Sequence, residues 1–172
     1  MLVDNNNRIS KAIASWSTAL ESKHFLTVEK PTLGFKISYP YNWNIIDNDF
    51  LITFKAPQNT ATVTFSISNL TSKANLTLEQ YSSNEINNIK SVESKKAGNV
   101  IKFESKPHLL SGQPGYGIVF LNGTNTYPTY KTLLVWSLVD GTVYQIGYST
   151  KVSEYSNYIE IVFYMIDSFR IL

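Results

Sequence analysis

The sequence predicts an α+β fold, with one antiparallel sheet and helices packed on its faces. Three observations support this prediction. Helical periodicity is confined to three stretches, and most segments between them alternate apolar and polar residues with a period of two. Hairpin turn signals dominate the connections, and the strand–helix–strand rhythm that builds parallel sheets is absent. The expected order is therefore helix, strands, helix, strands, helix.

Each predicted helix has one apolar arc. Residues 5–21 follow an Asp/Asn cluster that offers N-caps, and a capping box of Thr77 and Gln80 opens a helix that runs to about Val92. The last helix covers residues 153–169, with an apolar arc of Tyr155, Tyr158, Ile159, Val162, Phe163 and Ile166.

The first helix carries Trp16 on its apolar arc, and we expect this indole to anchor the helix to the rest of the protein. The predicted organisation is an N-terminal helix over residues 1–22, packed on a domain that covers residues 23–172. No internal repeat or linker interrupts this domain.

The strand prediction is clearest in three stretches. Residues 34–44 read as a strand that ends at a corner, because Pro40 cannot donate to a ladder and Trp43 can fold back over the strand end. Residues 61–68 alternate perfectly, and residues 130–139 are apolar on both faces, as in a central strand. Asp140 and Gly141 then form a hairpin turn.

Composition excludes several classes of protein. The 172 residues are 43% hydrophobic, which fits one globular domain and excludes a disordered chain. The net charge is +2, with Arg8 and Arg170 as the only arginines, so the clustered cations needed for nucleic-acid binding are missing. Without cysteine there is no disulfide, thiolate metal site or thiol nucleophile, and no apolar run is long enough to span a bilayer.

The surface composition favours a location outside the cytoplasm. Charged residues make up 16% of the chain, and Ser, Thr and Asn replace them. Asn69, Asn75 and Asn122 each begin a glycosylation sequon in a predicted loop, although a chain rich in these residues produces such triplets by chance. The N-terminus lacks a secretory signal, so either the protein is made without one or a signal or anchor has been removed from this sequence, and we favour the second.

Seven short motifs follow one another between Phe25 and Leu172. They lie at Gly34–Trp43, Phe54–Pro57, Leu76–Tyr81, Leu110–Tyr116, Asp140–Tyr148, Tyr155–Tyr158 and Met165–Phe169. In this order they resemble the PsbP-like domain, named after an extrinsic protein of photosystem II.

The resemblance implies an α/β/α sandwich around a central antiparallel sheet. It also implies export, because members of this family are mostly secreted or lipid-anchored, including archaeal and bacterial relatives without photosynthesis. The predicted helix before Phe25 departs from the photosynthetic pattern, which favours a non-photosynthetic relative. A nuclear-import factor shares the fold, so the fold does not define the function.

Candidate chemistry is sparse. His24 and His108 are the only histidines, and neither has a partner at a metal-ligand spacing. No Gly-x-Ser-x-Gly elbow is present, and Asp47 with Asp49 fits a turn better than a weak calcium site. The sequence therefore predicts no catalytic residue, no cofactor and no metal site. The alternative is a metal-binding or hydrolytic protein that uses His24 or His108.

The predicted function is that of a non-catalytic, extracytoplasmic binding or assembly module. We expect a monomer that contacts an unidentified protein through a sheet edge, the loop at Gly112 or a tyrosine-bearing surface. Membrane association would come only through a lost anchor or the partner. The 11 tyrosines fit either a binding surface or ordinary sheet packing. An intracellular interaction protein of the nuclear-import type is a further alternative.

Overall fold

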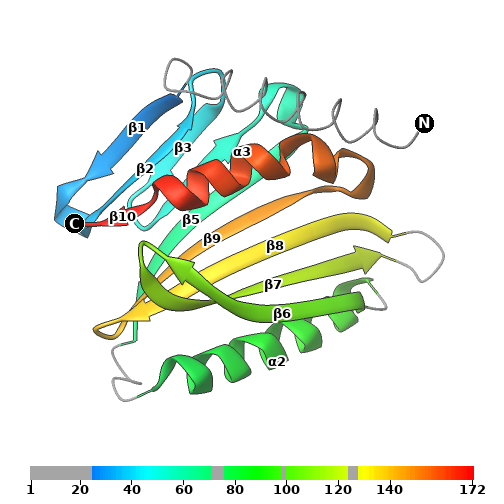
Figure 1. The fold of residues 1–172 in the computed structure, drawn as a ribbon. Coiled ribbons are helices and arrows are strands. Elements are labelled where there is room, and N and C mark those ends of the chain that lie inside the picture. Colours follow the sequence, from blue (N-terminus) through cyan, green and yellow to red (C-terminus); the bar gives the residue numbers. More distant parts are fainter. Residues whose placement is uncertain (1–24, 71–75, 98–99, 124–127) are drawn as a thin grey trace, which may run out of the picture.

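A computed structural model describes residues 25–70, 76–97, 100–123 and 128–172 (Figure 1). The predicted N-terminal helix, its boundary with the domain, Trp16 and His24 lie outside these residues. The strands are β1 Phe25–Lys30, β2 Phe35–Pro40, β3 Asn44–Asn48, β4 Leu51–Lys55, β5 Ala61–Asn69, β6 Val100–Leu110, β7 Gln113–Gly123, β8 Pro128–Val139, β9 Thr142–Lys151 and β10 Arg170–Ile171. The helices are α2 Leu78–Ala97 and α3 Tyr155–Ser168, with short 3-10 turns at Pro31–Leu33, Pro57–Asn59 and Val152–Glu154.

The strands form two sheets, and every pair is antiparallel. The main sheet has seven strands in the order β3-β4-β5-β9-β8-β7-β6, and a small sheet has the order β1-β2-β10. The expectation of one sheet is therefore wrong for β2, whose inward residues Phe35 and Ile37 belong to the small sheet. Period-two alternation identifies a buried strand face but carries no information about which strand lies beside it.

The two helices lie on opposite faces of the main sheet. Alternate residues of one strand enter different cores: Leu133 and Val135 pack with α3 and the small sheet, while Trp136 packs with α2. In Figure 1, α3 runs beside β5 and β9, and α2 lies along β6 and β7. The predicted α+β fold, a sandwich with a central antiparallel sheet and helices on both faces, is confirmed.

Two hairpins of the main sheet turn tightly at residues with positive φ. Asp140 and Gly141 have φ of 48° and 74°, and Ser111 and Gly112 have φ of 56° and 75°. Consecutive positive φ values match the twist of the flanking strands, which is why such pairs dominate two-residue hairpins. The hairpin predicted at Asp140 is confirmed, and the loop at Gly112 is a two-residue turn, because β6 ends at Leu110 and β7 begins at Gln113.

The capping box at the start of α2 is present in both directions. The Thr77 amide donates to Oε1 of Gln80 at 3.0 Å, and the Gln80 amide donates to Oγ1 of Thr77 at 3.2 Å. The helix continues to Ala97, beyond the predicted end near Val92. On α3 the predicted apolar arc is correct except for Phe163, whose side chain is 40% exposed.

The corner after β2 is built as the sequence indicates. The Trp43 amide donates to the Pro40 carbonyl at 3.0 Å, which turns the chain back toward the core. The Trp43 side chain is 5% exposed and meets Tyr158 of α3 edge to face, with ring centroids 5.9 Å apart. Trp43 is therefore a core residue that connects the corner to α3.

Candidate binding groove

The register of β6, β7 and β8 places three polar residues of β6 beside an apolar floor. Glu104, Lys106 and His108 alternate along β6, so their side chains point to the same face of the sheet. The paired rows across the three strands are Glu104–Val119–Leu133, Lys106–Gly117–Val135 and His108–Gly115–Ser137. Since Leu133 and Val135 belong to the core under α3, this is the α3 face of the sheet.

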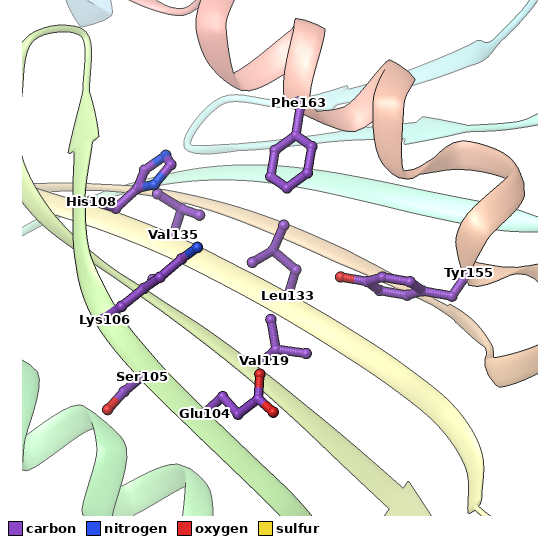
Figure 2. A pocket seen from close by; sticks show the side chains of 10 residues that line it. Glu104, Ser105, Lys106, His108, Val119, Leu133, Val135, Tyr155 and Phe163 are labelled. Atoms are coloured by element: carbon purple, nitrogen blue, oxygen red, sulfur yellow. The ribbon is translucent and has the colours of Figure 1, made fainter. Parts of the chain in front are cut away.

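Helix α3 forms the opposite wall. Figure 2 shows the Phe163 and Tyr155 side chains projecting from α3 toward Leu133, with Lys106 and His108 facing them from β6. The hollow between these walls has a volume of about 300 Å³. This volume lies at the lower end of the range of small-molecule sites. Leu133 and Val135 line the hollow although both are buried.

A glycine opens the hollow. A Cβ at Gly117 would lie 3.7 Å from the His108 Cβ and 3.8 Å from a Val135 methyl carbon, so a side chain there would fit beside both and enter the hollow. The neighbouring Gly115 has a different role, since a Cβ there would lie 2.3 Å from the Trp136 carbonyl oxygen. Gly115 therefore permits close approach of the backbones of β7 and β8, whereas Gly117 leaves empty space in the hollow.

His108 is half-buried at the end of the hollow. Its Nε2 atom is buried and has no hydrogen-bond partner in the structure. Burial lowers the pKa of His108, the charge of Lys106 adds to this effect, and Asp167 opposes it. The imidazole is therefore neutral at pH 7, with one nitrogen able to donate and the other able to accept a hydrogen bond.

Tyr155 supplies a second polar group to the hollow. Its backbone carbonyl accepts a hydrogen bond of 2.9 Å from the Tyr148 hydroxyl, which holds this end of α3 on the sheet. Burial raises the pKa of the Tyr155 hydroxyl to about 12, so the hydroxyl stays protonated. The Lys131 Nζ lies 4.0 Å from the centre of the Tyr155 ring, a cation–π contact that fixes the ring at the mouth of the hollow.

Two shallower hollows adjoin the central one. One of about 150 Å³ is lined by Glu104, Val119 and Lys131, among others. The other, of about 480 Å³ and more open, is lined by His108, Asp167 and their neighbours. Because each shares lining residues with the central hollow, the three form one groove along β6, which we call the β6 groove.

The structure places the other predicted site residues away from this groove. Asp47 pairs with the Lys30 Nζ at 2.5 Å, which supports a structural role for this turn. Asn69 ends β5 and Asn122 lies in β7, so the predicted loop position is wrong for both. Asn69 accepts a hydrogen bond of 3.1 Å from Thr142, while Asn75 and the side chain of Asn122 lie outside the described part of the chain. Among the described residues, no three His, Asp or Glu side chains gather as a metal site would require.

The structure bears on two of the predicted contact surfaces for a partner protein, the sheet edge and the tyrosine-bearing surface. β6 is an edge strand, but Pro107 removes one of its backbone donors, a common protection of sheet edges. Three tyrosines belong to the core, namely Tyr144, Tyr148 and Tyr155. The groove itself was not predicted. The alternation of Glu104, Lys106 and His108 was visible in the sequence, but the wall formed by Phe163 and Tyr155 depends on where α3 packs.

The fold is that of an α+β sandwich protein of the PsbP-like type, and comparison with solved structures confirms it. The solution structure of CyanoP, the PsbP of the cyanobacterium Synechocystis sp. PCC 6803, matches with a TM-score of 0.66 and 15% identity, over 87% of this chain and 93% of that chain. The resemblance inferred from the seven motifs is thus confirmed at the level of the fold.

Two further structures share this fold. A point mutant of the protein Mog1 matches with a TM-score of 0.58 and 9% identity, over 87% of this chain and 96% of that chain. LpqN, a Mycobacterium tuberculosis protein involved in cell envelope biogenesis, matches with a TM-score of 0.52 and 13% identity, over 86% of this chain and 91% of that chain. No family model matches the sequence, and no curated protein sequence matches it. None of the described helices is long and apolar enough to cross a membrane.

Proposed function

We propose that this protein is a non-catalytic accessory module that binds a partner protein through the β6 groove, outside the cytoplasm. The observation that carries the proposal is the groove itself: an apolar floor left open by α3, lined by polar groups and entered beside the exposed Phe163. Aromatic side chains around a concave apolar surface are typical of binding sites for protein segments.

The location outside the cytoplasm has two supports. The sequence has the low charge content and sequons described above. One protein of the same fold, LpqN, takes part in cell envelope biogenesis. Fractionation of the native organism tests this part of the proposal, since recovery of the protein in the cytosol would contradict it and favour an intracellular interaction protein.

Groove-dependent capture of a partner tests the binding role. Gly117→Val adds a branched side chain to the hollow without requiring a positive φ. The control Thr62→Val makes a nearly isosteric change on β5, a strand that does not line the groove. Tagged wild-type protein and both variants are incubated with solubilised membranes, and captured proteins are quantified by mass spectrometry.

We expect a partner that is captured by the wild-type protein and by Thr62→Val, and at least tenfold less by Gly117→Val. Circular dichroism and thermal unfolding must first show that both variants are folded. Equal capture by the folded Gly117→Val variant would contradict the proposal, because a filled groove could not then be the binding surface.

A further inference from the structure

The β6 groove has the shape of a site for an extended chain. Its three adjoining hollows follow β6 from Glu104 to His108, four residue steps apart. At about 3.3 Å per residue this distance is on the order of 13 Å, enough for about four extended residues. A compact small molecule would fill the central hollow and leave the two shallower ones empty.

The central hollow accepts one apolar side chain. Its floor is Val119, Leu133 and Val135, and Phe163 offers an exposed aromatic ring at its wall. A volume of about 300 Å³ accommodates a side chain as large as phenylalanine. Removing such a side chain from water is the largest favourable contribution that this groove can make to binding.

Among the polar groups beside the floor, Lys106 is the one that selects for a carboxylate. Lys106 is exposed and has no ion-pair partner among the described side chains, and it lines the same hollow as the apolar floor. Lys131 adds a second positive charge where the central hollow meets its neighbour. Glu104 and Asp167 also line the groove, so the preference for a carboxylate applies beside Lys106, whose charge a purely apolar ligand would cover without pairing it.

His108 needs a partner that the folded chain does not provide. Its buried Nε2 atom has no hydrogen bond, a state that costs free energy, and the residue itself lines the groove. A neutral imidazole pairs with either a backbone amide or a carbonyl of a bound segment. The Tyr155 hydroxyl, which remains protonated, offers a further donor from the opposite wall.

We propose that the β6 groove binds an extended segment of the partner protein in which an apolar side chain stands next to a carboxylate. The apolar side chain enters the central hollow and the carboxylate pairs with Lys106. This inference rests on the proposed function, because it names what the partner presents to the same groove.

Three synthetic hexapeptides test the inference on the whole chain. The first has the sequence Ac-Gly-Ser-Phe-Asp-Ser-Gly-NH2, the second replaces its Asp by Asn, and the third replaces its Phe by Ala. Binding is followed by NMR titration of backbone amides, with the amides of β6, β7 and β8 as reporters. Lys106→Ala removes the proposed pairing charge from an exposed position, and Lys55→Ala on β4 removes a lysine outside the groove.

For the wild-type protein we expect the Asp peptide to bind about fivefold more tightly than the Asn peptide, as for a solvent-accessible ion pair. The Ala peptide should bind at least about tenfold more weakly, since its side chain leaves the hollow empty. Lys106→Ala should abolish the preference for Asp over Asn, and Lys55→Ala should keep it. This double comparison isolates the pairing energy from general effects of charge.

The inference is overturned if the Asp and Asn peptides bind equally, if the preference survives in Lys106→Ala, or if no peptide shifts the reporter amides. The last result can be separated from failure of the proposed function. If Gly117→Val still prevents capture of the partner while no peptide binds, the groove is the binding surface but recognises a different chemistry.

Discussion

The α3 face of the main sheet has two halves that differ in what covers them. Over β5, the ring centroid of Phe65 lies 4.2 Å from that of Phe35 in the small sheet and 5.1 Å from that of Phe169 after α3, so this half is a buried aromatic core. Over β7 and β8 the face also carries aliphatic residues, but β6 contributes Glu104, Lys106 and His108, and α3 borders this half on one side only and leaves the groove.

Aliphatic residues occur in both halves, so they alone did not decide which half became a site; the groove half also has polar residues on β6 and a glycine, Gly117, on β7. Val63 on β5 and Val119 on β7 both point to the α3 face, yet Val63 is fully buried and Val119 lines the groove. The sheet is wider than the layer above it, because α3 and the small sheet together cover only part of seven strands. On the opposite face of the sheet, α2 packs against the strands that α3 leaves uncovered.

The largest expected difference between the two halves is in the stability loss caused by truncating an aromatic side chain in each. Trp43→Ala in the covered half should lower the free energy of unfolding by about 3–5 kcal/mol, because it leaves a cavity beside Tyr158. Phe163→Ala at the groove should cost less than about 1 kcal/mol, because its side chain is already 40% exposed. Urea unfolding measures both, and similar losses for the two variants would show that the groove half is as tightly packed as the core.

A smaller effect tests how α2 supports the groove strands from behind. The Trp136 indole is fully buried and donates a hydrogen bond of 2.9 Å to the Ser82 hydroxyl. Ser82→Ala leaves this donor unpaired, which should cost about 1–3 kcal/mol. Its matched control is Ser83→Ala at the exposed neighbouring position, which should change stability by less than about 0.5 kcal/mol. An equally small effect at Ser82 would mean that the indole finds another partner.

The smallest effect is a dependence of stability on alkaline pH, from one tyrosine at the groove and one on α2 at the opposite face. Burial raises the pKa of Tyr155 at the groove and of Tyr81 on α2 to about 12, with the Glu85 charge adding to the effect at Tyr81. Between about pH 10 and 12 the unfolded chain loses these protons while the folded chain keeps them, so stability falls as pH rises through this range. Below pH 10 the contribution is fully present.

Tyr155→Phe and Tyr81→Phe should each reduce this alkaline loss, as measured by urea midpoints at several pH values from 9 to 12. Each substitution removes a group that must stay protonated in the folded state, so the stability curve of the variant becomes flatter. A curve as steep as that of the wild-type protein in both variants would show that these hydroxyls ionise without unfolding.

Much of the fold was predictable because its signals are local. The capping box of Thr77 and Gln80, the hairpin at Asp140 and the corner at Trp43 each depend on residues close together in the chain. The motif order from Phe25 to Leu172 extended these local signals to a fold family, which the comparison with CyanoP confirmed. Strands with period-two alternation, such as β5, were correct for the same reason.

The misses depend on contacts between distant segments. β10 is two residues long and exists only because Arg170 and Ile171 lie beside β2. Phe163 belongs to an apolar helical arc, and whether it is buried depends on where the edge of α3 falls over the sheet. The groove depends on the same offset, and the predicted roles of His24 and residues 1–22 stay predictions.

By itself the sequence determined the α+β class and the antiparallel hairpins, because these follow from the periods of strands and helices and from local turn residues. Only the tertiary structure decided that β2 leaves the main sheet and that α3 stops short of β6. Lateral placement of one layer on another is set by packing of the whole core, and no stretch of sequence encodes it locally.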